Sequence, residues 1–151
     1  MCCLRDRMAE RRVKATVDKN GWVTCFKVVR VCVDRRYRPE VACMAPPFKR
    51  GKNTIPDEQQ ILPRYSYMRP HGFHTFLHYK DARYAKGRSR TLRIVRVRAH
   101  MSNFMRAGCS WERCPGTEPS LIQVVFSSIT IPTFKEYKPT PKENPPGVWT
   151  E

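Results

Sequence analysis

The sequence predicts an α+β fold that is mainly β, with one small antiparallel or mixed sheet, one or two short helices, a long proline-rich loop and extended termini. Apolar, β-branched and aromatic residues gather in a few short segments that alternate as strands do. The 13 prolines are concentrated outside these segments, where they remove backbone donors and disfavour helix and inner strand. A length of 151 residues suits one domain.

Residues 22–33, WVTCFKVVRVCV, form the clearest predicted strand. Both of its faces carry apolar residues, which is typical of a central strand that is covered on two sides. Residues 73–78 alternate as a second strand. Residues 80–87 follow as a short helix, and Gly87 is placed to cap its C-terminus.

Two further strands are predicted in the second half of the chain. In residues 90–101 the apolar phase slips between Ile94 and Val95, which predicts a β-bulge. Residues 121–131 predict one continuous strand. The strands together predict a core of Val28, Val29, Val31, Phe73, Phe76, Ile94, Val97, Val124 and Phe126.

Composition divides the chain into three parts. Residues 1–20 mix basic and acidic side chains and predict a charged N-terminal arm or surface helix. Residues 21–134 form the single α+β domain, which contains the proline-rich loop 34–70. Residues 135–151 are polar and rich in proline, which predicts an extended C-terminal tail.

A net charge of +16 is the strongest property of the whole sequence. Such a charge favours an acidic partner, either nucleic acid or an acidic protein surface. No acid lies between Asp81 and Glu112, while arginines recur there. The candidate polyanion-binding residues are Lys49, Arg50, Lys52, Arg88, Arg90, Arg96 and Arg98. Trp149 is a candidate anchor of the tail in a partner's pocket.

The seven cysteines are an odd number, and the N-terminal residues lack the apolar run of a secretory signal. We therefore expect free thiols in a reducing compartment. Cys25 and Cys32 lie in the first strand, where a free cysteine behaves as a small hydrophobe. No segment approaches the length of ~18 apolar residues that a transmembrane helix needs.

A zinc site is an alternative for the histidines and the later cysteines. Its ligands would come from His71, His74, His78, Cys109 and Cys114. CSWERC is a single C-x₄-C pair, however, whereas zinc sites usually combine two closely spaced pairs. The favoured interpretation packs the histidines around a strand end, with no metal.

At residues 72–87, GFHTFLHYKDARYAKG, the chain resembles ADP-ribosyltransferase-like folds, in which a strand with glycine and an aromatic residue precedes a short helix. The resemblance implies an NAD-dependent transferase, with Arg30, His71 or Tyr84, and Glu118 as the site positions, or a degenerate relative without activity. The Ser-Thr-Ser element of those enzymes is absent. The same stretch resembles small uncharacterised phage and virus proteins that carry a GFH strand.

The leading interpretation is a strongly basic, non-enzymatic interaction or structural protein without a cofactor. It would bind nucleic acid or an acidic protein surface within a larger assembly. The second resemblance implies a virus- or phage-encoded minor component of a particle. The expected location is therefore inside the cell or within a virus particle, without secretion by a signal peptide. The transferase is the alternative.

Overall fold

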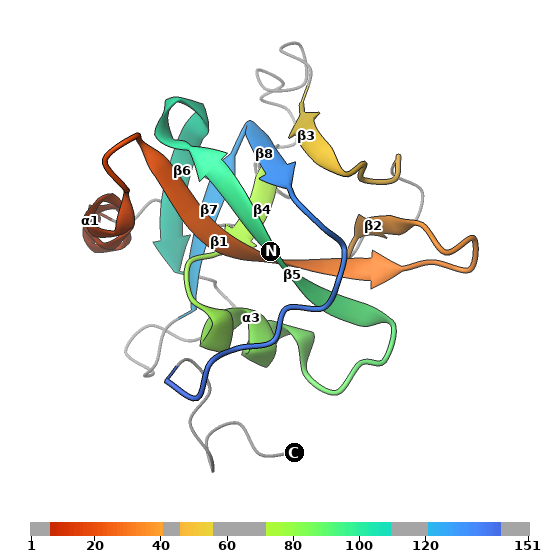
Figure 1. Cartoon of the computed structure of the whole chain (residues 1–151). Helices are drawn as coiled ribbons and strands as arrows, with labels where there is room; N and C mark the ends of the chain where they lie inside the picture. The colour runs from red at the N-terminus through yellow and green to blue at the C-terminus, as the bar shows by residue number, and fades with distance from the viewer. Residues whose placement is uncertain (1–6, 41–45, 56–71, 110–120, 143–151) are drawn as a thin grey trace, which may run out of the picture.

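The computed structural model describes residues 7–40, 46–55, 72–109 and 121–142. Within these ranges the chain is mainly β, and one antiparallel sheet of eight strands is flanked by two short α-helices (Figure 1). The predicted α+β class is confirmed. The helices are α1 (Arg7–Thr16) and α3 (Tyr79–Lys86), and the strands are β1 (Trp22–Val31), β2 (Tyr37–Pro39), β3 (Gly51–Thr54), β4 (Phe73–Phe76), β5 (Leu92–His100), β6 (Phe104–Cys109), β7 (Ile122–Phe126) and β8 (Ser128–Ile131).

Strand β1 lies at the centre of the sheet, as its sequence predicts. The strand order is β3-β8-β5-β1-β4-β7-β6, and β2 pairs with β1 beside this path. Strands β1 and β5 pair without a register shift from Trp22–His100 to Arg30–Leu92. This long ladder joins β1 and β5 in the middle of the sheet.

The predicted bulge at Ile94 and Val95 is wrong, because both residues belong to the unbroken ladder with β1. Both side chains are fully buried, and they point to opposite faces of the sheet, as neighbours on a strand do. Each face has its own apolar cover, so two successive apolar residues need no bulge.

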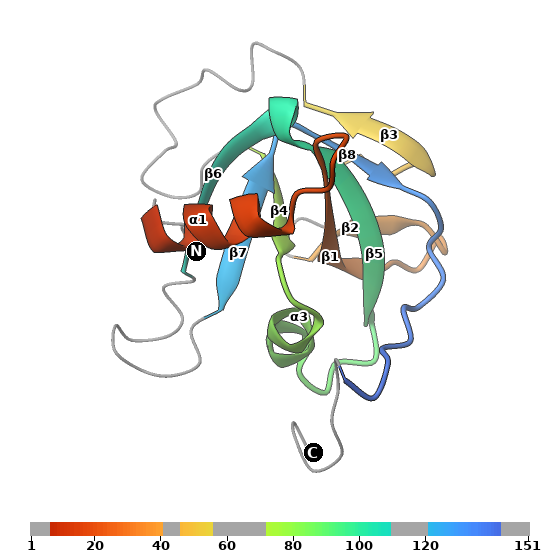
Figure 2. The same cartoon turned by 60° about the vertical axis from the view of Figure 1, so that its left-hand side comes forward.

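The helices lie on different parts of the sheet (Figure 2). Helix α1 contributes Ala9 and Val13 to the larger core, which also contains Val23, Val97 and Phe126. Helix α3 contributes Tyr79 and Ala82 to a second core. Because apolar side chains leave water on both faces, β1 and β5 are stabilised from two sides.

The second core lies under α3. Its members are Phe26, Val28, Phe76, Tyr79, Ala82, Leu92, Ile94 and Leu121. Asp81, in the first turn of α3, is buried, and its Oδ2 accepts a hydrogen bond of 3.1 Å from the amide of Ile122. Gly87 ends the helix at φ +59° and donates its amide to the Arg83 carbonyl, as predicted for a C-terminal cap.

The residues of the expected core are buried except at two partly buried positions, but they are divided between two clusters and do not form one core. Val31 stands at the end of β1, and Phe73 packs against the edge of the larger core. The other seven expected side chains are buried, and they are Val28, Val29, Phe76, Ile94, Val97, Val124 and Phe126.

The expected single strand over 121–131 is wrong, because the chain leaves the ladder at Ser127. There the amide of Ser127 donates to the Asn103 carbonyl at 2.9 Å. Strand β7 then pairs with β4 and β6, whereas β8 pairs with β5 and β3. The interruption lets one apolar segment serve two separate parts of the sheet.

Short strands also occur where the sequence predicts irregular chain. Strands β2 and β3 lie within the expected loop 34–70, and β6 lies where no strand is expected. Pro39 ends β2, which pairs with β1 alone among the described strands, and such an edge position tolerates the missing donor of proline. These strands depend on partners far away in sequence.

The segment after β8 is docked on the domain, which corrects the tail boundary expected at residue 135. The amide of Tyr137 donates to the Ile94 carbonyl at 2.9 Å, and Glu136 Oε2 accepts from the Ile94 amide at 2.9 Å. The Tyr137 ring lies 5.0 Å from that of Phe26 and 5.6 Å from that of Tyr79. The segment therefore extends the second core.

Candidate polyanion-binding site

Four residues form a row across the sheet, one each from β3, β8, β5 and β1. Lys52 is opposite Thr130, Thr130 is opposite Arg98, and Arg98 is opposite Thr24. Directly opposed residues project from the same face, about 5 Å apart. Lys52, Arg98 and Thr24 are exposed, and Thr130 is half-buried. The row therefore forms a polar strip with two cations.

Two more side chains extend this strip along the strands. Arg96 and Trp22 lie two residues from Arg98 and Thr24 and share their face, because strand side chains alternate. Arg96 is exposed and Trp22 half-buried. We call this surface the basic face, and its residues are Trp22, Thr24, Lys52, Arg96, Arg98 and Thr130.

A tight turn before β1 fixes Trp22. Asp18 Oδ1 accepts hydrogen bonds from the amides of Asn20 and Trp22, at 2.8 and 2.9 Å. Gly21 adopts φ +86°, and a Cβ at this position would lie 2.6 Å from Nε2 of His100. Its carbonyl accepts from the Met101 amide at 2.8 Å. The Asn-Gly turn thus also ties β1 to the end of β5.

Arg98 lies over the Trp22 ring, with its guanidinium carbon 4.9 Å from the ring centroid. Its Nη2 is 3.9 Å from Asp18 Oδ2, and 49% of the side chain is exposed. An exposed pair of this length contributes little stability. Arg98 therefore has a preferred position while much of its surface faces solvent.

Arg96 has a similar relationship with Tyr137, from the docked segment after β8. The guanidinium carbon of Arg96 lies 5.7 Å from the Tyr137 ring centroid. Because Tyr137 packs on Phe26, which is paired with Arg96, the ring lies at the border between the second core and the basic face. Both arginines of the basic face thus stand beside aromatic rings.

Asp18 is the acid beside this face. The backbone hydrogen bond from Trp22 is the main cause that holds the pKa of the Asp18 carboxyl below its ordinary value, and Arg98 acts in the same direction. The carboxylate is therefore charged at neutral pH. It partly offsets the positive charge of Arg98.

The predicted polyanion residues fall into separate places. Lys52, Arg96 and Arg98 meet on the basic face. Lys49 and Arg50 are exposed just before β3, where the Asn53 side chain donates to the Lys49 carbonyl at 2.8 Å. The other two predicted residues are Arg88 and Arg90. They are exposed in the turn between α3 and β5, at the end of β5 that lies away from Arg98.

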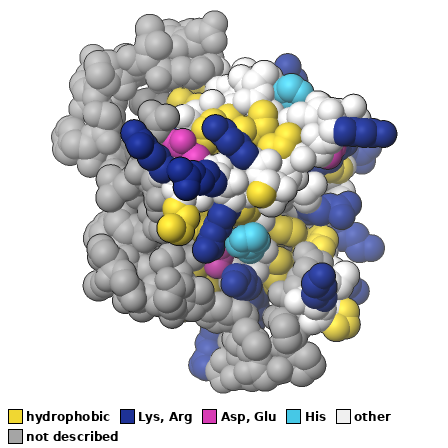
Figure 3. Space-filling view, turned by 90° about the vertical axis from the view of Figure 1, so that its left-hand side faces the viewer, with side chains coloured by type: hydrophobic (Ala, Val, Ile, Leu, Met, Phe, Trp, Pro, Cys, Tyr) yellow, Lys and Arg dark blue, Asp and Glu magenta, His cyan; other side chains and the backbone are white. Residues whose placement is uncertain are grey.

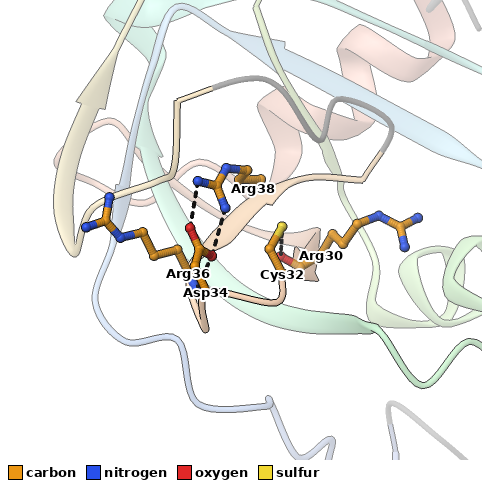
Figure 4. Close-up of polar contacts among 5 residues, drawn as sticks. All are labelled: Arg30, Cys32, Asp34, Arg36 and Arg38. Atoms are coloured by element: carbon orange, nitrogen blue, oxygen red, sulfur yellow. Dashed lines mark hydrogen bonds and ion pairs between the residues drawn. The ribbon is translucent and has the colours of Figure 1, made fainter.

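A second polar arrangement lies in the hairpin between β1 and β2 (Figure 4). Arg38 donates two hydrogen bonds of 2.9 Å to the Asp34 carboxylate, and this lowers the pKa of Asp34 to about 2. Arg35 stands at φ +65° in the turn. Because Arg38 and Asp34 satisfy each other, this pair stabilises the hairpin.

The positions implied by the transferase resemblance are not brought together as a described site. Arg30 donates to the Glu40 carbonyl and to Thr91 Oγ1, each at 2.9 Å. Tyr84 is 43% exposed on α3. Glu118 lies outside the described residues. NAD-dependent activity therefore stays an untested prediction.

Some of the cysteines, and some of the histidines considered for the zinc site, lie among the described residues. Cys25 and Cys32 are free, and burial raises the pKa of the Cys25 thiol to about 12. His74 Nδ1 is 3.3 Å from the Gly72 carbonyl, and His78 is half-buried before α3. No group of three or more potential metal ligands occurs among the described residues. His71, Cys114 and the Cys109 side chain fall outside them.

Sequence reasoning missed Trp22, Asp18 and Tyr137 as parts of the site. The spacing alone could have placed Trp22 on the face of Thr24, because the two residues are two positions apart on one strand. Tyr137 could not, because its position depends on a contact with β5. Trp149, the candidate anchor, lies outside the described residues.

Within the described ranges, neither helix has the length and apolar character needed to cross a membrane. No protein-family model matches the chain, and no curated protein or solved structure matches it either. The resemblances at residues 72–87 therefore remain expectations.

Proposed function

We propose that this chain is a non-enzymatic, strongly basic binding protein that holds a polyanion on its basic face. The row Lys52–Thr130–Arg98–Thr24 carries the proposal, because it places two exposed cations and two hydroxyl-bearing residues side by side on a rigid sheet. Cations supply the attraction to phosphates, and hydroxyl groups can donate hydrogen bonds to phosphate oxygens.

The positive charge of the basic face is only weakly neutralised by Asp18. The ion pair between Arg98 and Asp18 is long and exposed, so it competes weakly with an external anion. This differs from the Arg38–Asp34 pair, in which two short hydrogen bonds occupy the guanidinium. The contrast favours a binding role for Arg98 and a structural role for Arg38.

The whole chain would reinforce such binding. Its net charge of +16 attracts acidic partners over a distance of about one Debye length. We further propose that the protein acts in a larger assembly, as a virus- or phage-encoded component. This part of the proposal is supported by the sequence resemblance and the basic composition.

Heparin chromatography of the full chain tests the proposal. The triple variant Lys52→Gln, Arg96→Gln, Arg98→Gln should elute at clearly lower salt than the unchanged protein. The matched control is Arg7→Gln, Arg11→Gln, Lys14→Gln on α1, which removes the same charge from the side shown in Figure 3. Equal shifts for both variants would mean that only net charge matters and would contradict a binding face.

A further inference from the structure

We propose that the polyanion is a single-stranded nucleic acid whose bases stack at Arg98 and Arg96, beside the rings of Trp22 and Tyr137. The inference rests on the proposed function and deepens it. It is carried by the two arginine–aromatic pairs, with distances of 4.9 and 5.7 Å between guanidinium carbon and ring centroid.

These four side chains follow one line along β5. Arg96 and Arg98 are two residues apart on the same face, which separates them by about 7 Å. Trp22 lies beyond Arg98, since it is paired with His100. Tyr137 lies beyond Arg96, since its amide bonds to Ile94. The order is therefore aromatic, cation, cation, aromatic.

This order suits a chain that offers both phosphates and free base faces. Bases in single strands stack on aromatic rings and on guanidinium planes, whereas phosphates follow the positive charge. Duplex nucleic acid keeps its base faces inside the stack, and an acidic protein surface has no bases. Neither of these partners would use the rings.

Asp18 gives a second reason to expect a base at Arg98. Its carboxylate, 3.9 Å from Nη2, disfavours a phosphate at that edge of the guanidinium. A neutral base on the exposed side of Arg98 does not meet this repulsion. Phosphates would then lie nearer Arg96 and Lys52, both exposed. Thr130 supplies a hydroxyl between Lys52 and Arg98, and Thr24 supplies one on the other side of Arg98.

Tryptophan fluorescence tests the inference in the full chain. The sequence has three tryptophans, so Trp111→Phe and Trp149→Phe leave Trp22 as the only one. Titration with oligothymidylate should quench Trp22 emission, because a base stacks close to the ring. A duplex of equal length and heparin should bind with little quenching. Unchanged Trp22 emission at saturation with oligothymidylate would overturn the inference without any further variant.

The variant Trp22→Leu separates stacking from charge. Its affinity for oligothymidylate should fall by about 5- to 150-fold, the factor that corresponds to stacking of one base. Heparin affinity should stay unchanged, and Trp22→Phe should keep most of the oligothymidylate affinity. Tyr137→Leu provides the same comparison at the other pair if Trp22→Leu does not fold.

The outcomes distinguish the inference from the proposed function. Equal weakening of oligothymidylate, duplex and heparin by Trp22→Leu would refute base stacking but leave polyanion binding intact. Failure of the unchanged protein to bind any of the three ligands would refute both.

Discussion

The guanidinium of Arg98 lies between an aromatic ring and a carboxylate. Its carbon is 4.9 Å from the centroid of Trp22, and its Nη2 is 3.9 Å from Asp18 Oδ2. The same Asp18 side chain accepts the amide of Trp22. The turn from Asp18 to Trp22 thus places both the aromatic ring and the carboxylate next to the Arg98 guanidinium of β5.

Replacing Asp18 with Asn should strengthen polyanion binding. The Asn oxygen can still accept the amides of Asn20 and Trp22, so the turn is kept while the negative charge beside Arg98 is lost. We expect a gain in affinity of up to about fivefold, the range of an exposed charge pair. Fluorescence anisotropy with a labelled oligonucleotide measures the gain.

The matched control for that variant is Glu10→Gln on α1, which changes the net charge equally. It should raise the affinity less. An equal or larger gain from Glu10→Gln would show that Asp18 has no local effect on the basic face.

Removal of the Asp81 carboxylate should destabilise the domain. Asp81 is fully buried and accepts the Ile122 amide, so Asp81→Ala leaves a buried donor without this acceptor. The expected loss is about 1–3 kcal/mol in the free energy of unfolding. Urea denaturation compares it with Lys80→Ala, an exposed neighbour that should change stability by less than about 0.5 kcal/mol. Similar losses for both variants would contradict the structural role of Asp81.

Acidification should destabilise the fold through His78. Burial lowers the pKa of this imidazole, and Lys80 and Arg12 lower it further. The unfolded chain therefore takes up the proton more readily than the folded chain. The contribution of neutral His78 is complete above its ordinary pKa of about 6.5 and is lost as pH falls below that value towards the lower folded pKa. Denaturation midpoints for His78→Gln should depend less on pH over this window, and an identical dependence would refute the assignment.

Truncation of Tyr137 should weaken the second core. Its ring packs on Phe26 and Tyr79 and is half-buried. Tyr137→Ala should therefore cost about 1–3 kcal/mol, somewhat less than loss of a fully buried aromatic ring. Deletion of residues 138–151 should change the thermal midpoint less than Tyr137→Ala and should weaken binding to the partner, because it removes Trp149. A larger thermal effect of the deletion would place the rest of the tail in the core.

The sequence predicted the central strand well because local composition determines it. Residues 22–33 carry apolar side chains on both faces of the strand, and both faces of β1 are covered in the structure. The same two-sided burial misled the interpretation of Ile94 and Val95, where successive apolar residues imitate a bulge. Alternation alone cannot separate a strand with two buried faces from a strand with a slipped phase.

Strands that depend on distant partners could not be predicted in this way. The segment Gly51–Thr54 is short and polar, and it becomes a strand by pairing with β8. The basic face also depends on pairing between strands that are distant in sequence. Its cations are visible in the sequence, but the register that aligns Lys52 with Arg98 passes through Thr130. Only the sheet shows which basic residues share a surface.

The salt dependence of oligonucleotide affinity tests the central claim most directly. Each phosphate contact contributes about 0.7–0.9 to the slope of log affinity against log salt. The triple variant Lys52→Gln, Arg96→Gln, Arg98→Gln should therefore reduce the slope by roughly 1.4–1.8, because Lys52 and Arg96 are the phosphate contacts and Arg98 faces a base. The control Arg7→Gln, Arg11→Gln, Lys14→Gln should leave the slope nearly unchanged. An unchanged slope in the basic-face variant, or an equal reduction in the control, would contradict binding through this face.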